Sequence, residues 1–99
     1  MSKTGVELIA EERQEQITKH QRDLNHDVAI NDELQLSEAA YGLLAKDFHE
    51  YPPDYDELTP YKWDENAYKK LFNKPFKDRL IIAGALIAAE IDRLNHLEK

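Results

Sequence analysis

The sequence predicts an all-α protein, a small helical bundle built from three main helices and one short helix. Apolar residues recur at helical spacing in residues 5–24, 33–48 and 76–96, and the short helix is expected over 64–72. The chain has 99 residues, close to the commonest size of one domain, so we expect a single helical domain over 1–99. Because it contains no cysteine, a hydrophobic core rather than disulfides must hold it together.

The first two helices are predicted from their apolar stripes and from the residues that precede them. Thr4 and Gly5 lie where the first helix would start. Its stripe consists of Val6, Ile9, Ala10, Ile17 and Leu24. Residues 24–32 then break the pattern with Asn and Asp, which favour turns and helix caps, and Asp32 is the expected N-cap of the second helix. The stripe of that helix consists of Leu36, Ala39, Ala40, Leu43, Leu44 and Phe48.

The most apolar stretch of the chain, Leu80 to Ala89, lies inside the last predicted helix, and Pro75 stands at or just before its first turn. One face of this helix carries Leu80, Ala83, Gly84, Ile87, Ala88, Ile91 and Leu94. The opposite face carries Ile82, Ala85, Leu86 and Ala89. A helix that is apolar on two faces must be covered from two sides. We therefore expect it in the middle of the bundle or packed partly against a second copy of the chain, with a dimer as the default homo-oligomer.

A long connection rich in proline and aromatic residues separates the second and third main helices. Residues 49–66 hold three of the four prolines and the only tryptophan, and adjacent prolines exclude a regular helix there. The aromatic residues of this loop are Tyr51, Tyr55, Tyr61 and Trp63. They can fold back and close the end of the bundle, or they can offer flat faces to a base or a partner. In the second case Lys62, Lys74 or Arg79 is near enough in sequence to bind a phosphate.

The charge balance disfavours several classes of function. There are 20 acidic and 13 basic side chains, a net charge of -7, and no cluster of Lys and Arg that would grip the backbone of a nucleic acid. The apolar run is shorter than the roughly 20 residues that cross a bilayer, and the N-terminus becomes charged too early for a signal peptide. We expect a cytoplasmic protein that binds neither nucleic acid nor membrane.

Three polar side chains, Arg13, Gln16 and His20, lie on or beside the apolar stripe of the first helix. A guanidinium facing a core needs a partner, because an unpaired buried charge costs on the order of several kcal/mol. Glu90 is the leading candidate partner, and such a pair would be structural. The alternative is that these side chains form the wall of a pocket for an anionic ligand. The candidate ligand-binding residues are Arg13, Gln16, His20, Tyr61, Trp63, Lys74, Arg79 and Glu90, and no catalytic or metal-binding residue is assigned.

Residues 11–15, EERQE, match the EExxE half of the magnesium signature of MazG-like nucleotide pyrophosphohydrolases. That chemistry also needs ExxD on a facing helix, so that several carboxylates hold cations against phosphates. This second half is missing, because Glu90 and Asp92 are two residues apart and do not share a helix face. Glu11 and Glu15 also point away from the apolar stripe, which favours a solvated charged face. Under this alternative the magnesium ligands would be Glu11, Glu12, Glu15, Glu90 and Asp92, and otherwise no cofactor is expected.

Several stretches together resemble a family of small helical proteins from phages, prophages and bacteria. They are EERQEQI, NDELQLSEAAYGLL, WDE, NKP and DRLIIAGALIAAEIDRL. The resemblance implies an all-helical protein in the cytoplasm that acts on host or phage machinery, including as a counter-defence factor, and it supplies no catalytic residues. We therefore expect a non-enzymatic binding protein that captures a nucleotide-like ligand or a host protein. The alternatives are a divergent magnesium-dependent pyrophosphohydrolase and a purely structural or regulatory interaction protein.

Overall fold

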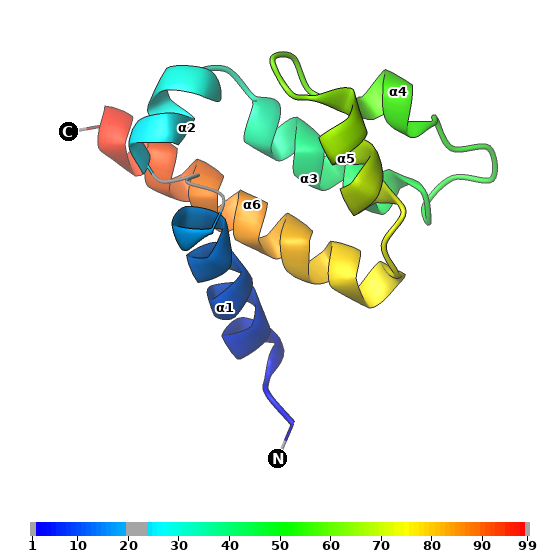
Figure 1. Ribbon diagram of the computed structural model, residues 1–99, viewed down its shortest axis with the longest axis horizontal. Coiled ribbons are helices and arrows are strands. Elements are labelled where there is room, and N and C mark those ends of the chain that lie inside the picture. The colour runs from blue at the N-terminus through cyan, green and yellow to red at the C-terminus, as the bar shows by residue number, and fades with distance from the viewer. Residues whose placement is uncertain (1, 20–23, 99) are drawn as a thin grey trace.

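The computed structural model describes residues 2–19 and 24–98, and this part of the chain is all-α, as predicted. Its helices are α1 (Gly5–Thr18), α2 (Leu24–Ile30), α3 (Gln35–Ala45), α4 (Tyr55–Leu58), α5 (Glu65–Phe72) and α6 (Phe76–Leu97). In Figure 1, α6 crosses the molecule diagonally, with α1 on one side of it and α3 and α5 on the other. The long C-terminal helix is therefore the element around which the others are arranged.

The core lies where α3, α5 and α6 meet. It consists of Leu36, Ala39, Ala40, Leu43, Tyr68, Phe72, Ile82, Ala83, Leu86 and Ala89. The face of α6 that carries Ile82, Leu86 and Ala89 is thus enclosed, which confirms that part of the prediction. Burial raises the pKa of the Tyr68 phenol, whose hydroxyl donates a hydrogen bond of 2.8 Å to the carbonyl oxygen of Ala39. The phenol therefore stays neutral, and its one buried polar atom is satisfied.

Two glycines allow helices to approach closely. A Cβ atom at Gly42 of α3 would lie 2.2 Å from the hydroxyl oxygen of Tyr68, so a side chain there would clash with the core. A Cβ atom at Gly84 of α6 would lie 2.6 Å from Cδ1 of Ile9 on α1. Gly84 therefore lets α1 lie close to α6.

Local signals place the beginnings of three helices correctly. Thr4 forms a capping box with Glu7 at the start of α1. The short helix predicted over 64–72 is α5, whose N-cap Asp64 accepts a hydrogen bond of 3.0 Å from the backbone N–H of Ala67. Pro75 is the N-cap of α6, where a missing N–H costs nothing.

The segment between the first two main helices differs from its prediction. The first helix ends at Thr18 rather than 24, and residues 24–30, expected to be a turn, form α2. The side chains of Asp27 and Asn31 are both buried, and the amide of Asn31 donates a hydrogen bond of 2.8 Å to the carboxylate of Asp27 one turn earlier. This contact stabilises the helix. Trp63 of the loop donates a hydrogen bond to Asn31, and Arg13 of α1 lies 3.9 Å from Asp27. This tertiary context overrides the preference of the two residues for turns.

Asp32 does not cap the next helix, contrary to the prediction. α3 begins at Gln35, and its N-cap Leu34 makes no side-chain hydrogen bond. Asp32 instead accepts hydrogen bonds from Lys62 at 3.2 Å and from Gln35 at 3.3 Å. These hydrogen bonds, the one from Lys62 first, lower the pKa of Asp32 and tie the start of α3 to the aromatic loop.

The proline-rich connection contains the single turn of α4, and only some of its aromatic side chains pack against the core. Tyr55 and Trp63 lie partly buried against the core, as in the interpretation that the aromatics close the bundle. Tyr51 and Tyr61 are 88% and 68% exposed and take no part in this closure. The loop is thus anchored at some aromatic residues and free at others.

Candidate functional site

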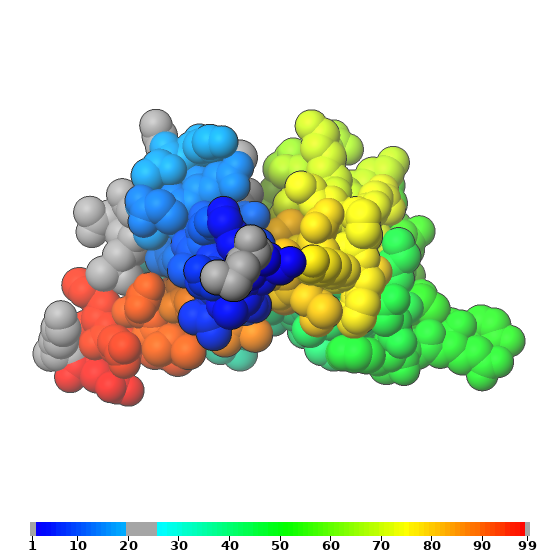
Figure 2. Space-filling model, turned by 90° about the horizontal axis from the view of Figure 1, so that it is seen from below, coloured from blue at the N-terminus to red at the C-terminus, as the bar shows by residue number. Residues whose placement is uncertain are grey.

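A cleft of about 350 Å³ separates α1 from α5 and has α6 at its floor. It is lined by Glu12, Glu15, Gln16, Asp64, Asn66, Ala67, Lys70, Leu71, Lys74 and Ile82. In Figure 2 the cleft is visible as a notch between α1, in blue, and the yellow-green α5. Its walls come from residues 12–16 and 64–74, which are far apart in the sequence, so the cleft exists only in the folded protein.

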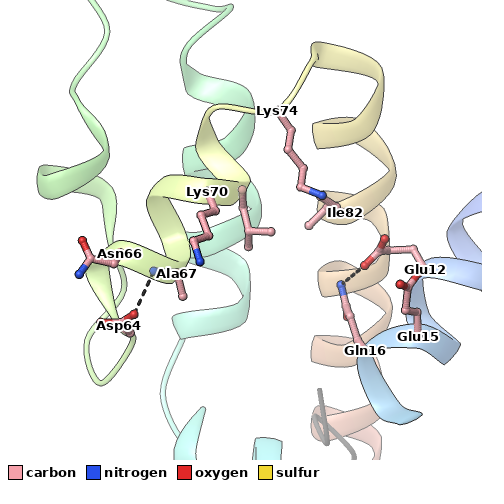
Figure 3. A pocket seen from close by; sticks show the side chains of 10 residues that line it. Glu12, Glu15, Gln16, Asp64, Asn66, Ala67, Lys70, Lys74 and Ile82 are labelled. Carbon is pink, nitrogen blue, oxygen red and sulfur yellow. Dashed lines mark hydrogen bonds between the residues drawn. The ribbon is translucent and has the colours of Figure 1, made fainter. Parts of the chain in front are cut away.

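The two walls of the cleft carry opposite net charge, although the carboxylate of Asp64 lies on the same wall as the lysines. Glu12 and Glu15 come from α1, and Lys70 and Lys74 come from α5 and the turn that follows it (Figure 3). Within residues 2–19 and 24–98, neither lysine makes an ion pair, so both ammonium groups are available to an anion. The cleft is therefore dipolar, with a cationic side and an anionic side.

Uncharged groups lie between these walls. Gln16 is 2% exposed, and its amide Nε2 donates a hydrogen bond of 3.3 Å to Oε2 of Glu12, as the dashed line in Figure 3 shows. Leu71 and Ile82 supply apolar surface at the floor. Apolar floor and a few convergent polar groups are typical of sites for small organic ligands.

A second hollow of about 170 Å³ continues the cleft. It shares Asp64 and Ala67 with the first, and it is further lined by His26, Ile30, Asn31, Lys62 and Trp63. The indole Nε1 of Trp63 donates a hydrogen bond of 2.6 Å to Oδ1 of Asn31. The indole also packs edge-on against Tyr68, with ring centroids 6.1 Å apart. The tryptophan is thus held in one orientation at the wall of this hollow.

Behind the second hollow, buried polar groups join three helices. Asn31 links Trp63 to Asp27, and Asp27 lies 3.9 Å from Nη2 of Arg13 on α1. The same guanidinium nitrogen lies 3.5 Å from a carboxylate oxygen of Asp92 on α6. The predicted pair of Arg13 with Glu90 is therefore wrong, because two other carboxylates are closer to this arginine.

Glu90 and Arg79, two of the predicted ligand-binding residues, have structural roles elsewhere. Glu90 is buried, accepts a hydrogen bond of 2.7 Å from Ser37, and pairs with Arg93 at 2.6 Å. Arg79 is 4% exposed and donates hydrogen bonds to the carbonyl oxygens of Leu43 and Lys74 at 2.7 and 2.9 Å. It also pairs with Asp47 at 2.5 Å. Both side chains are occupied by hydrogen bonds and ion pairs within the fold, and neither lines the cleft.

The structure brings three of the eight predicted site residues to the cleft. Gln16 and Lys74 line its main part, and Trp63 lines the continuation. Arg13 lies behind it in the polar network, whereas Tyr61 lines neither hollow. His20 lies outside the described residues.

Sequence reasoning missed Lys70, Asp64 and Asn31. The signal for the lysine was the KKLFNKP stretch, which places Lys70 and Lys74 four residues apart. Asp64 and Asn31 were interpreted only as a helix start and a turn residue. Which side of α2 and α5 would face α1 depends on packing that local sequence does not specify.

The carboxylates proposed for magnesium do not assemble as that alternative requires. Glu12 and Glu15 line the cleft rather than a fully solvated face, while Glu11 pairs with Lys3. Glu90 and Asp92 are engaged with Arg93 and Arg13 instead. Over residues 2–19 and 24–98, no group of three or more acidic, histidine or cysteine side chains is placed to hold a metal ion.

None of the helices in the described ranges combines the length and apolar character needed to span a bilayer. No family model, curated protein or solved structure matches this chain.

Proposed function

We propose that this protein is a non-enzymatic binding protein whose cleft between α1 and α5 captures a nucleotide-like ligand. One observation carries the proposal: two lysines that form no ion pair with any described residue face a carboxylate and amide wall across an apolar floor. A nucleotide has the same division, with an anionic phosphate at one end and a flat base with N–H donors at the other. The cleft thus offers ammonium groups that can bind the phosphate and a carboxylate and an amide that can bind the base.

Lys70 and Lys74 would bind the phosphate. Each ammonium offers three donors on a flexible stem, and charge-assisted hydrogen bonds to phosphate oxygens are among the stronger polar contacts. Both side chains are exposed in the free protein, so binding does not have to break an existing ion pair. Their sequence spacing lets both reach the same phosphate group.

Glu12 and Gln16 would recognise the base. A carboxylate accepts two adjacent N–H groups, such as those on one edge of a guanine, and the amide of Gln16 can both donate and accept. Leu71 and Ile82 would cover one face of the ring. The cleft, at about 350 Å³, is large enough for a small organic ligand.

The experiment is a thermal-shift and calorimetric screen of nucleosides, nucleoside phosphates and cyclic dinucleotides. We expect at least one phosphorylated compound to raise the melting temperature, and its parent nucleoside to bind more weakly. The double variant Lys70→Gln/Lys74→Gln should lose most of this difference, and Glu12→Gln should weaken binding of compounds with amino-bearing bases. Lys69→Gln is the matched control, because Lys69 is turned toward Tyr55 on another side of α5.

Two outcomes contradict the proposal. One is that no phosphorylated compound shifts the melting temperature. The other is that the double lysine variant binds as well as the wild-type chain does. The phage-type setting implied by the sequence resemblance belongs to the same proposal, in which capture would withdraw a nucleotide signal from host machinery in the cytoplasm.

A further inference from the structure

α6 exposes a stripe of four aliphatic side chains on the side away from the core. Leu80, Ile87, Ile91 and Leu94 are 43%, 48%, 53% and 44% exposed. Ile91 follows the buried Ile82 by nine residues, which at about 100° per residue places it on the opposite side of the helix. These side chains belong to one of the two apolar faces expected of the last helix, a face on which Ala83 is buried and Gly84 lies against Ile9 of α1. Among the described residues, no other helix covers it fully.

The stripe carries no charge in a chain of which 33% is charged. The charged residues of the same part of α6 are turned elsewhere, since Glu90 and Arg93 pair with each other and Asp92 pairs with Arg13. With a net charge of -7, two copies of this chain repel each other over most of their surface. On this uncharged face they can meet without placing like charges in direct contact.

A groove runs beside the stripe. It encloses about 340 Å³ between α3 and α6, and is lined by Ser37, Ala40, Tyr41, Leu44, Ile87, Glu90 and Ile91. A ridge of aliphatic side chains and an apolar groove therefore lie next to each other on the same surface. In a two-fold contact the same patch is used by both subunits, so a patch must contain both shapes to fit itself.

Residues of opposite charge flank the two ends of the uncharged stripe. Lys77 stands near the N-terminal end of α6 and Glu98 directly follows its C-terminal end, with Ile87 midway between them. Two antiparallel copies of α6 that cross near Ile87 would place Lys77 of each copy beside Glu98 of the other. The helix has 22 residues, or about 33 Å, so this contact would extend along most of the molecule's longest dimension of 41 Å.

We propose that a second copy of this chain covers the stripe, forming a two-fold dimer in which the two α6 helices pack antiparallel. The dimer face lies on the side of α6 opposite Ile82, whereas the cleft is lined by Ile82 itself. Dimerisation therefore leaves both clefts open and does not depend on the ligand proposed above.

The test is the oligomeric state of the full chain, measured by sedimentation equilibrium at high micromolar concentration. We expect a dimer for the wild-type chain and a monomer for Ile87→Glu and for Ile91→Glu. Both positions are about half exposed, so circular dichroism should show unchanged helicity. Tyr51→Glu is the control, because Tyr51 is 88% exposed on the loop and the variant should remain dimeric.

The charged ends test the antiparallel arrangement. Lys77→Glu should weaken the dimer several-fold, because it places two carboxylates together at each end. Adding Glu98→Lys should restore the wild-type affinity. A wild-type chain that stays monomeric, a higher oligomer, an Ile91→Glu variant that stays dimeric, or a charge-swapped double variant as weak as Lys77→Glu overturns the proposal.

Discussion

The two sides of α6 are held by different kinds of contact. Toward α3 and α5 the helix buries mainly aliphatic and aromatic groups, and Leu86 at its centre is 0% exposed, although Arg79 and Glu90 also form buried hydrogen bonds to α3. Toward α1 and α2 the buried groups are polar, and Gln16 is the only buried residue of α1. Apolar burial stabilises a contact whatever the relative orientation of the two surfaces. Buried ion pairs and hydrogen bonds add little net stability, but they require one particular geometry. The first side stabilises the fold, and the second orients it.

This difference matters for the cleft, because its walls belong to different sides. The lysine wall is attached to the apolar core through α5, and the carboxylate wall stands on α1. A ligand that bridges the walls binds only the folded arrangement, so it would stabilise the α1 side more than the core. We expect α1 and α2 to gain most protection from hydrogen exchange when ligand is bound.

The largest expected effect is on stability, and it distinguishes the core side of α6 from the side that faces α1. Leu86→Ala should lower the free energy of unfolding by about 3 kcal/mol, because it leaves a cavity in the core. Ile9→Ala, at the contact of α1 with Gly84, should cost about 1 kcal/mol, since Ile9 is only partly buried. Urea denaturation followed by circular dichroism measures both. Equal costs would show that α1 belongs to the core.

The polar side is tested by Asp27→Asn, which keeps the shape of the side chain and removes its charge. Asp27 is 1% exposed and faces Arg13, so we expect a loss of about 2 kcal/mol and faster hydrogen exchange in α2. Asp92→Asn is the matched control. Its carboxylate is 55% exposed beside the same guanidinium, so it should cost less than about 0.5 kcal/mol. Similar costs for the two variants would contradict the distinction.

Close packing on the core side is tested at Gly42. Gly42→Ala should cost between about 1 and 2 kcal/mol, because the new methyl group meets the Tyr68 hydroxyl. In a Tyr68→Phe background the same change should cost less, since that hydroxyl is gone. A double-mutant cycle from chemical denaturation gives the coupling. A cost for Gly42→Ala that is the same in both backgrounds would show that the clash is relieved in another way.

The smallest expected effect lies at the start of α1. Hydrogen bonds from Thr4, its backbone N–H first, lower the pKa of Glu7 below its ordinary value of 4.5. A carboxylate with a lowered folded pKa stabilises the helix above its unfolded pKa and loses this contribution as the pH falls through the folded value. Between neutral pH and about pH 5, Glu7→Gln should therefore fray the first turn, as measured by hydrogen exchange. Below the folded pKa the variant and the wild type should converge.

The helices that sequence patterns predicted well are those with strong local signals. Thr4 and Glu7, Asp64, and Pro75 each satisfy or remove backbone N–H groups within one turn, so the beginnings of α1, α5 and α6 follow from neighbouring residues alone. The apolar periodicity of α3 and α6 likewise identified the core face that contains Leu36, Leu43 and Leu86.

The predictions that failed concern polar residues whose partners lie far away in sequence. Arg13 was assigned to Glu90, because the sequence shows that a buried charge needs a partner without showing which one. α2 was predicted to be a turn, since the contacts of Asp27 and Asn31 with Arg13 and Trp63 are tertiary.

By itself, the sequence determined the all-α class, the central role of α6 and its two apolar faces, because helical periodicity and capping act within a few residues. The tertiary structure alone decided that one of those faces is left open, that Lys70 and Lys74 stand opposite Glu12, and that α2 is a helix. The reason is physical: apolar burial requires only a face, whereas an ion pair or a binding cleft requires particular atoms from distant segments to meet at short range.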